Sequence, residues 1–282
     1  MARTVIIRQV DLDTAVTALV LGVDARDRIL ASAAGAEPAQ LADPHVLCIE
    51  AGGSGDGAHN NFDHHDTCHN LPPACVQALA WSRVSDPALE RLVRYAAAVD
   101  LRRPWTKPAA FPTLSAIFSG MRLVVREPVA QLRAGLALLR TLRARKLDPF
   151  GTMPALREWA AYIAARRAES DALAADLRRA RLFRTNGGRR AGYVESRHFG
   201  ALGGLYRLGC DIAIACHPAF GEPPRRKYSI GTTGLRLGPL AEQLNRHRPG
   251  WGGPAHGTVI ASGPAGADMN PWNLEDLVGC YA

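Results

Sequence analysis

The chain has 282 residues, of which 47% are hydrophobic and 21% are charged, and its formal net charge is +8. This length allows one large domain or two modest domains with real cores, and the composition is ordinary for a soluble globular protein. No apolar run approaches membrane-spanning length, which excludes a membrane-spanning protein, and the excess of Lys and Arg favours an anionic partner: a phosphate ester, a nucleotide or a nucleic acid.

The cysteines are typical of reduced, buried thiols rather than of a disulfide framework. None of them forms a C-x-x-C pair, and four of the six lie inside apolar runs. The first residues also lack the long apolar core of a signal peptide. We therefore expect a cytoplasmic protein. The six residues are Cys48, Cys68, Cys75, Cys210, Cys216 and Cys280.

The first predicted element is a β-strand at residues 4–7, where β-branched residues form a buried run. A helix is predicted at 15–21. Asp11 and Asp13 lie between the two, at the carboxyl edge of the expected sheet, where open α/β folds bind their ligands. The alternative role for Asp13 is simpler, because an aspartate before a helix often caps its first turn.

A second concentration of polar residues follows two more short strands, predicted at 29–31 and 46–50. The later strand ends on Glu50, and a glycine-rich turn at 51–57 precedes Phe62-Asp63-His64-His65. Carboxylate and imidazole together bind borderline cations such as Mn²⁺, Zn²⁺ and Fe²⁺, and a second imidazole can reach a phosphoryl oxygen. The triplet therefore suits a divalent-metal hydrolase. The alternative is a polar loop that holds two histidines by chance.

Helices predicted at 72–84 and 87–99 follow this triplet, and the second of them stops at Asp100. Strands that alternate with helices predict a parallel α/β sheet. The polar residues that fall at or just beyond the ends of elements are Asp11, Asp13, Glu50, His64, His65 and Asp100.

The second half of the chain begins with a mostly helical stretch and a clear break at 148–151. Pro154 then opens a long helix that we expect to connect two lobes. Beyond it, strands are predicted at 191–195, 211–216 and 227–230, and a helix at 237–245. A Gly-Gly loop follows, and its backbone amides could approach a phosphate closely, with Arg248 and His256 as further donors.

These motifs, in this order, resemble the DHH phosphoesterase family, and the resemblance covers nearly the whole chain. The first half carries D-x-D after the first strand, an acid at a later strand end, D-H-H, and an aspartate after a helix. The strand Lys227-Tyr228-Ser229-Ile230, the next helix and the Gly-Gly loop resemble the DHH-associated C-terminal domain. The resemblance implies an α/β protein of two lobes with the active site in the cleft between them. Its parts are a DHH catalytic domain with a parallel sheet at 1–150, a linker helix at 151–184 and a smaller α/β substrate-binding domain at 185–282.

The resemblance also implies a dinuclear metal site, usually of manganese, with one or two ions bound and with Mg²⁺ or Co²⁺ as alternatives. Carried over by position, Asp11 and Glu50 would hold the first ion. The second ion would be held by Asp13, Glu50, His64 and Asp100, so that Glu50 bridges the pair. Two such cations can activate a bridging water and neutralise the charge of a phosphate.

The remaining roles implied by the resemblance concern catalysis and the substrate. His65 would face the substrate phosphate, and Asp63 would orient a neighbouring imidazole. In the C-terminal domain, the residues that would bind the substrate are Arg248, Gly252, Gly253 and His256.

The sequence departs from the family pattern in three places. Gln9 and Ile7 stand where the family carries a histidine, and a carboxamide is a weaker ligand for such ions than an imidazole. Glu50 replaces an aspartate, which moves its carboxylate by roughly an ångström. Pro254 and Ala255 interrupt the G-G-G-H spacing of the loop. We therefore expect the second ion to be held more firmly than the first.

These expectations favour a metal-dependent phosphoesterase that acts on a phosphorylated small molecule, such as a nucleotide, or on a short oligonucleotide. Two alternatives stay open. One is a weakened member of the family that binds a nucleotide or polyanion without turnover. The other is a plain oligonucleotide-binding protein unrelated to the family. The sequence favours no particular oligomeric state.

Overall fold

The structure of the protein is a computed structural model that describes residues 3–65, 71–101, 109–253, 257–263 and 269–281. Contacts within the chain divide it into two compact units, Met1–Arg166 and Arg167–Ala282. Within the described residues, no helix is long and apolar enough to cross a membrane. The cysteines described are free, and all but Cys280 are buried, as the apolar runs around them predicted.

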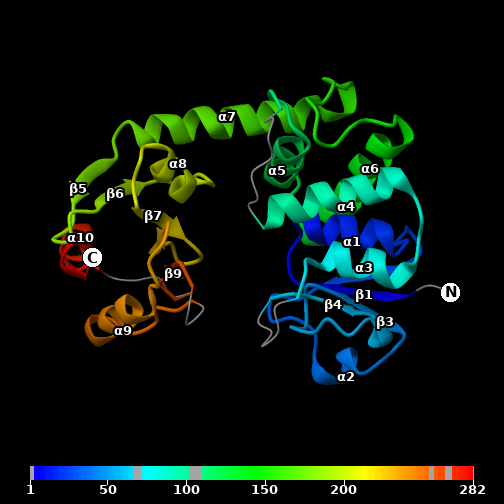
Figure 1. The fold of residues 1–282 in the computed structure, drawn as a ribbon, viewed down its shortest axis with the longest axis horizontal. Helices are drawn as coiled ribbons and strands as arrows, with labels where there is room; N and C mark the ends of the chain where they lie inside the picture. The colour runs from blue at the N-terminus through cyan, green and yellow to red at the C-terminus, as the bar shows by residue number, and fades with distance from the viewer. Residues whose placement is uncertain (1–2, 66–70, 102–108, 254–256, 264–268, 282) are drawn as a thin grey trace. The chain divides into compact units, whose positions relative to one another are not determined.

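The first unit is built on a four-stranded parallel sheet in the order β2-β1-β3-β4 (Figure 1). Because every pair of neighbours is parallel, the carboxyl ends of all four strands meet at one edge. The parallel sheet that the sequence predicted is confirmed. Its strands are β1 (Thr4–Ile7), β2 (Arg28–Ala31), β3 (Val46–Ile49) and β4 (Asn61–Phe62).

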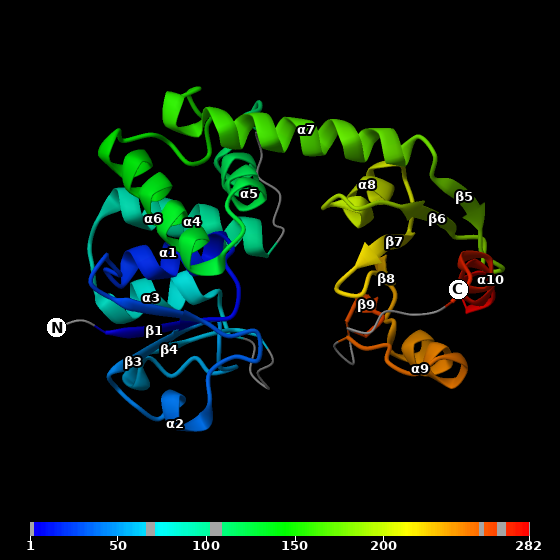
Figure 2. The same ribbon diagram turned by 180° about the vertical axis from the view of Figure 1, so that it is seen from behind.

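Helices cover this sheet on both faces. In Figures 1 and 2, α1, α3 and α4 lie on one face, whereas α2 lies on the other. Successive residues of β1 point to opposite faces of the sheet. Val5 and Ile7 pack into the large hydrophobic core under α1, α3 and α4, whereas Ile6 packs into the smaller core on the other face. The helices of the first unit are α1 (Leu12–Val20), α2 (Pro38–Leu41), α3 (Ala74–Ser82), α4 (Pro87–Asp100), α5 (Leu114–Val124) and α6 (Pro128–Ala144), with 3₁₀ turns η1 (Gly57–His59) and η2 (Arg157–Trp159).

The second unit is built on a five-stranded mixed sheet in the order β5-β6-β7-β8-β9. Its one parallel pair among the described strands is β6 and β7, and α8 (Ala201–Arg207) forms the crossover between them. The strands are β5 (Arg181–Arg184), β6 (Arg190–Glu195), β7 (Ile212–Phe220), β8 (Arg225–Thr232) and β9 (Val259–Ala261).

Two hydrophobic layers cover the faces of this second sheet. Leu240 of α9 (Gly238–His247) and Leu274 of α10 (Pro271–Tyr281) pack into one layer together with Tyr193 and Ile214. The other layer contains Leu205 of α8. The second unit is therefore a sandwich of helices and sheet with its own core, and the α/β class expected of both lobes is confirmed.

The connection between the two sheets is dominated by α7 (Ala160–Leu177), and the division between the compact units falls inside this helix. The predicted linker at 151–184 contains α7 and also β5. That strand pairs antiparallel with β6, so the end of the predicted linker belongs to the second sheet. The domain limits themselves stay a prediction.

Candidate metal centre

The polar residues that the sequence singled out follow strands of the parallel sheet. Asp11 lies just beyond β1, Glu50 follows β3 directly, and Asp63 and His64 follow β4. Asp100 is the last residue of α4. The fold thus brings residues from distant parts of the sequence to the carboxyl edge of one sheet, where α/β proteins bind their ligands.

His64 is the centre of this cluster. Its Nε2 lies 3.5 Å from Oε1 of Glu50 and 3.4 Å from Oδ2 of Asp100. Oδ2 of Asp13 lies 3.9 Å from the same nitrogen. Two ligand atoms bound about 2.1 Å from one ion lie about 3.0–3.4 Å apart at octahedral or tetrahedral angles. Each of the three acids is therefore spaced from His64 nearly as two ligands of one ion are.

Two atoms of the cluster are buried without a hydrogen-bond partner among the described residues: Oε1 of Glu50 and Nε2 of His64. Buried polar atoms of proteins are nearly always hydrogen-bonded, so this pair calls for an explanation. A cation between them would satisfy both. Carboxylate and imidazole are also the ligands that Mn²⁺, Zn²⁺ and Fe²⁺ accept. The residues present therefore fit a divalent metal ion.

Asp13 is fixed by the first turn of a helix that lies far along the chain. Its Oδ2 accepts a hydrogen bond from the backbone N–H of Ala74 at 2.8 Å, and its Oδ1 accepts one from that of Cys75 at 2.9 Å. These N–H groups open α3 and have no partner within the helix. Burial and the neighbouring Glu50 carboxylate nevertheless raise the pKa of Asp13 to about 7. A cation beside Asp13 would offset both effects.

The carboxylate of Glu50 contacts Thr14 of α1 through one oxygen and the imidazoles of His64 and His65 through the other. Its Oε2 accepts a hydrogen bond from the hydroxyl of Thr14 at 2.5 Å, which leaves Oε1 facing the histidines. Burial alone would raise the pKa of Glu50, but the imidazoles of His64 and His65 and the Thr14 hydroxyl lower it overall. The backbone of Glu50 has a φ of 50°, in the left-handed region that residues other than glycine rarely adopt. A strained residue therefore carries the central carboxylate.

Asp11 is tied to the start of α1. Its side chain accepts a hydrogen bond from the backbone N–H of Thr14 at 2.9 Å, and the Thr14 hydroxyl oxygen lies 3.0 Å from the same carboxylate. The cap of α1 is therefore Asp11, and the alternative that Asp13 caps it is wrong. Burial and the Glu50 carboxylate raise the pKa of Asp11 to about 6. Among the described residues, Asp11 belongs to neither group of closely spaced ligand atoms.

His65 stands at the outer side of the cluster. Its side chain is 43% exposed, its ring packs on that of His64 with centroids 4.2 Å apart, and its Nε2 lies 3.4 Å from Oε1 of Glu50. The Glu50 carboxylate raises the pKa of His65 to about 9. Two groups of atoms could hold an ion: Asp13, His64 and Asp100, and Glu50, His64 and His65. His65 is thus close enough to serve either as a ligand or as a phosphate contact.

The carboxylate of Asp63 binds backbone rather than an imidazole. Its Oδ2 accepts hydrogen bonds from the N–H groups of Gly52 at 3.1 Å and Gly53 at 2.7 Å. Its Oδ1 accepts one from the N–H of His65 at 2.8 Å. Asp63 therefore fastens the glycine-rich turn to the D-H-H stretch and sets the backbone from which both histidines project.

The substrate-binding residues expected in the second unit are only partly described. The N–H of Gly252, which we expected to meet a phosphate, instead donates to the carbonyl of Ala261 at 2.9 Å, because the loop folds back along β9. Gly253 is exposed, and Arg248 lines a hollow of about 220 Å³ together with His247. His256 lies outside the described residues.

Sequence reasoning missed Thr14, whose hydroxyl contacts both Asp11 and Glu50. It also missed the N–H groups of Ala74 and Cys75 that hold Asp13. The position of Thr14 directly after the D-x-D was the one available signal. The contact with α3 had none, because backbone amides do not depend on residue type.

No protein-family model matches the sequence, and no curated protein does. The chain is, however, similar in structure to a pGpG-specific phosphodiesterase, PggH from Vibrio cholerae, with a TM-score of 0.62 over 98% of this chain and 97% of that one, at 12% sequence identity. It is also similar to the DHH domain of a member of the s1p family of ribosomal proteins, with a TM-score of 0.50 over 92% of this chain and 82% of that one, again at 12% identity. The chain has the DHH fold.

The DHH fold gives the sequence resemblance a structural basis. At 12% identity, the likeness to both proteins concerns the course of the chain and leaves the chemistry of the site to be argued from its own residues. Those residues lie at the carboxyl edge of the sheet on which the DHH fold of the first unit is built.

Proposed function

We propose that the protein is a metal-dependent phosphoesterase that hydrolyses a phosphodiester or phosphomonoester of a small nucleotide or short oligonucleotide. The observation that carries this proposal is the pair of buried atoms, Oε1 of Glu50 and Nε2 of His64, that have no hydrogen bond within the described part of the chain. The DHH fold supports a phosphorylated substrate, and the similarity to a pGpG-specific phosphodiesterase supports a small nucleotide.

Manganese is the proposed ion, with Mg²⁺ or Co²⁺ as alternatives. Asp13, Glu50, His64 and Asp100 would hold one ion, and Asp11 would join Glu50 at a weaker second one. When bound, such ions polarise a phosphoryl oxygen and lower the pKa of a bound water.

The remaining roles, which are to position the metal ligands and to contact the phosphate, belong to the protein's own groups. Thr14 holds one oxygen of Glu50 so that the other faces the histidines. The backbone of α3 fixes Asp13. His65 is half-exposed at the outer side of the cluster, where a protonated imidazole can donate to an anionic phosphate.

A second candidate function is nucleotide binding without turnover. Asp11 favours it, because its side chain already accepts a hydrogen bond from the Thr14 backbone N–H as the cap of α1 and is less free to hold an ion. Gln9 favours it as well, because a carboxamide is a weaker ligand for such ions than an imidazole.

The deciding experiment measures hydrolysis of pGpG and of a bisphosphorylated nucleoside across a Mn²⁺ titration, with the metal content determined in parallel. In His65→Ala we expect hydrolysis to fall by roughly 100-fold or more with the metal content nearly unchanged, because a charged contact to the reacting phosphate is lost. The matched control is His59→Ala. His59 is an exposed histidine that pairs with Asp56 outside the cluster, and its removal should leave the rate unchanged.

Each outcome assigns the site differently. Loss of bound metal in His65→Ala would make that histidine a ligand, as its distance to Glu50 allows. Equal rates in His65→Ala and the unmodified protein would remove it from the mechanism. Bound Mn²⁺ with no product from either substrate would favour the binding function over hydrolysis.

A further inference from the structure

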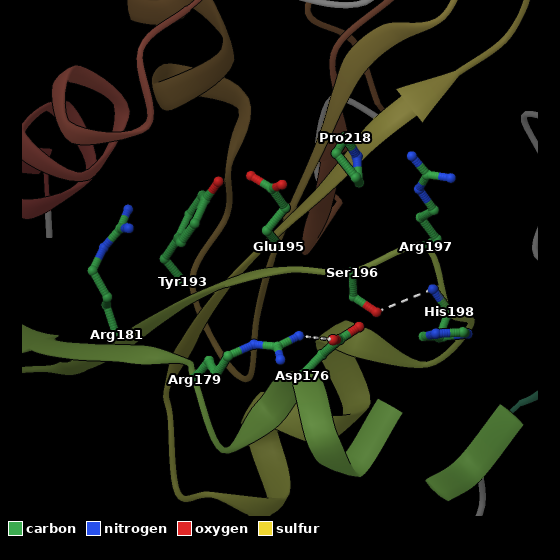
Figure 3. Close-up of a pocket in the computed structure, with 9 residues that line it drawn as sticks. All are labelled: Asp176, Arg179, Arg181, Tyr193, Glu195, Ser196, Arg197, His198 and Pro218. Carbon is green, nitrogen blue, oxygen red and sulfur yellow. Dashed lines mark hydrogen bonds and ion pairs between the residues drawn. The ribbon is translucent and has the colours of Figure 1, made fainter. Parts of the chain in front are cut away.

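A pocket of about 480 Å³ opens in the second unit (Figure 3). None of the residues that line it belongs to the candidate metal centre. Cavities of this size hold small organic ligands. It is formed by the end of α7, by β5 and β6, by the loop after β6 and by β7. The residues that line it are Asp176, Arg179, Arg181, Tyr193, Glu195, Ser196, Arg197, His198 and Pro218.

Most of the charges in this pocket already have partners. Arg179 pairs with Asp176 at 2.5 Å, His198 pairs with Glu169 at 2.8 Å, and Arg181 forms an ion pair with Glu275. Glu195 and Arg197 remain. Among the residues that the structure describes, neither of these two has a hydrogen bond or an ion pair through its side chain, and both are exposed.

The strand geometry explains why these two groups share the pocket. Tyr193, Glu195 and Arg197 alternate along β6 and the residues just beyond it, so they project to the same face. Figure 3 shows Glu195 and Arg197 extending on either side of Pro218, with the Tyr193 hydroxyl pointing the same way as the Glu195 carboxylate. An unpaired acid, an unpaired base and a phenol therefore line one wall.

Tyr193 supplies an independent sign that a ligand is missing. The residue is 3% exposed, and its hydroxyl has no hydrogen-bond partner in the described part of the chain. The neighbouring Cys216 thiol is at most a weak partner. Burial raises the pKa of Tyr193, so the hydroxyl keeps its proton and stays a donor. Arg181 lies over the ring at 4.3 Å and holds it in place.

The chemistry of this wall selects a ligand that carries two adjacent N–H donors and an anion. An ionised carboxylate accepts two parallel N–H bonds well, and guanine presents two neighbouring N–H groups on its pairing edge, whereas adenine does not. A guanidinium binds a phosphate through its fork of donors. We propose that this pocket binds a guanine mononucleotide, with the base on Glu195 and the phosphate on Arg197.

The test is calorimetric titration of GMP, AMP and guanosine into the full-length protein with EDTA present, so that no metal-held phosphate contributes. We expect GMP to bind at least about 10-fold more tightly than AMP or guanosine, since each comparison removes a charge-assisted contact. Glu195→Gln should abolish the preference for GMP over AMP. Arg197→Ala should weaken GMP to the level of guanosine, and Tyr193→Phe should weaken it without changing the base preference.

The controls are Arg178→Ala and Glu242→Gln, exposed residues that do not line the pocket, and neither should change GMP binding. Failure of GMP to bind at millimolar concentration would overturn the proposal. So would equal affinity for GMP and AMP, or binding that Arg197→Ala leaves intact. The measurement contains no hydrolysis step, so its failure is distinguishable from failure of the proposed phosphoesterase activity.

Discussion

Among single residues, Thr14 lies between two carboxylates of the candidate metal centre. Its one hydroxyl lies 3.0 Å from Asp11 and 2.5 Å from Glu50, in a position with no solvent access. One proton cannot be given to both carboxylates at once. The shorter distance to Glu50 indicates which acceptor receives it, and Asp11 retains the bond from the Thr14 backbone N–H. The division of ligands between the two proposed ions therefore depends on a residue that would bind neither.

The substitution Gln9→His tests whether the first ion is limited by its ligands. We expect the unmodified protein, purified with Mn²⁺, to hold about one ion per chain and Gln9→His to hold about two, because neutral imidazole binds such ions far better than a carboxamide. If the protein is an enzyme limited by this ion, its phosphodiesterase rate at low Mn²⁺ should rise as well. Elemental analysis and the rate assay give both readouts.

Ala164→His provides the control, since it adds an imidazole to an exposed position of α7 that has no histidine, cysteine or acid three or four residues away in the sequence. It should bind no further ion. Two tightly held ions in the unmodified protein would contradict the expectation.

At the scale of elements, α5 and α7 approach each other so closely at Gly120 that no larger residue fits there without a shift. A Cβ atom on Gly120 of α5 would overlap the carbonyl oxygen of Tyr162 in α7. Gly120→Ala should therefore lower the free energy of unfolding by about 1–3 kcal/mol, the usual cost of overpacking. Gly279 in α10 is the matched control, because nothing lies within 4 Å of its Cβ position. There alanine should be neutral or stabilise slightly. Urea titration of both variants measures the difference.

The buried carboxylate of Asp27 connects the N-terminal ends of β1 and β2, and its contribution to stability depends on pH. Asp27 is 5% exposed and accepts hydrogen bonds from the backbone N–H and the guanidinium of Arg3. Burial would raise the pKa of Asp27, but these contacts lower it overall. Its stabilising contribution is therefore fully present above the ordinary value of 3.8 and is lost as the pH falls through the lowered pKa.

Asp27→Asn should accordingly reduce the free energy of unfolding by about 1–3 kcal/mol at pH 7 and by less as the pH falls below about 4. The comparison requires chemical denaturation of both proteins over that pH range. A difference that stays constant from pH 7 to pH 3 would disprove the linkage.

Hydrophobic pattern predicted the longer elements better than the short ones. The β-branched run at 4–7 became β1, and the helices expected at 72–84 and 87–99 became α3 and α4. The two-residue strand β4 and the edge strand β5 were missed, because strands that short carry no readable period.

At the metal centre, residue type predicted which side chains meet but not what holds them. The acids and histidines can be recognised in the sequence as candidate ligands, because few other residue types bind such ions. The bonds from the α3 backbone to Asp13, and from Asp63 to the glycine-rich turn, arise from chain geometry that no residue in the sequence reveals.

For the whole molecule, the division into two compact units predicts that binding of the proposed metal ion stabilises the first unit more than the second. The proposed ligands all belong to Met1–Arg166. A ligand present at 100 times its dissociation constant stabilises the folded state by about 2.7 kcal/mol, which corresponds to about 100-fold slower exchange of amides that open by unfolding. Adding Mn²⁺ to the metal-free protein should slow hydrogen exchange in α1 and α4 by up to this factor, while β6 and β7 should change little.

Hydrogen-exchange mass spectrometry resolves these segments. His64→Ala is the reference protein, since it lacks the central imidazole and should show no protection upon addition of Mn²⁺. Equal protection of both units in the unmodified protein would mean that the ion acts on the chain as a whole.

The conformation of Glu50 has a consequence for which residue best suits position 50. A left-handed φ costs a residue with a Cβ atom roughly 1 kcal/mol or more, and glycine escapes this penalty. Replacing Glu50 with glycine would therefore relieve the backbone while removing the central carboxylate. Backbone stability and the proposed metal binding therefore make opposite demands on position 50.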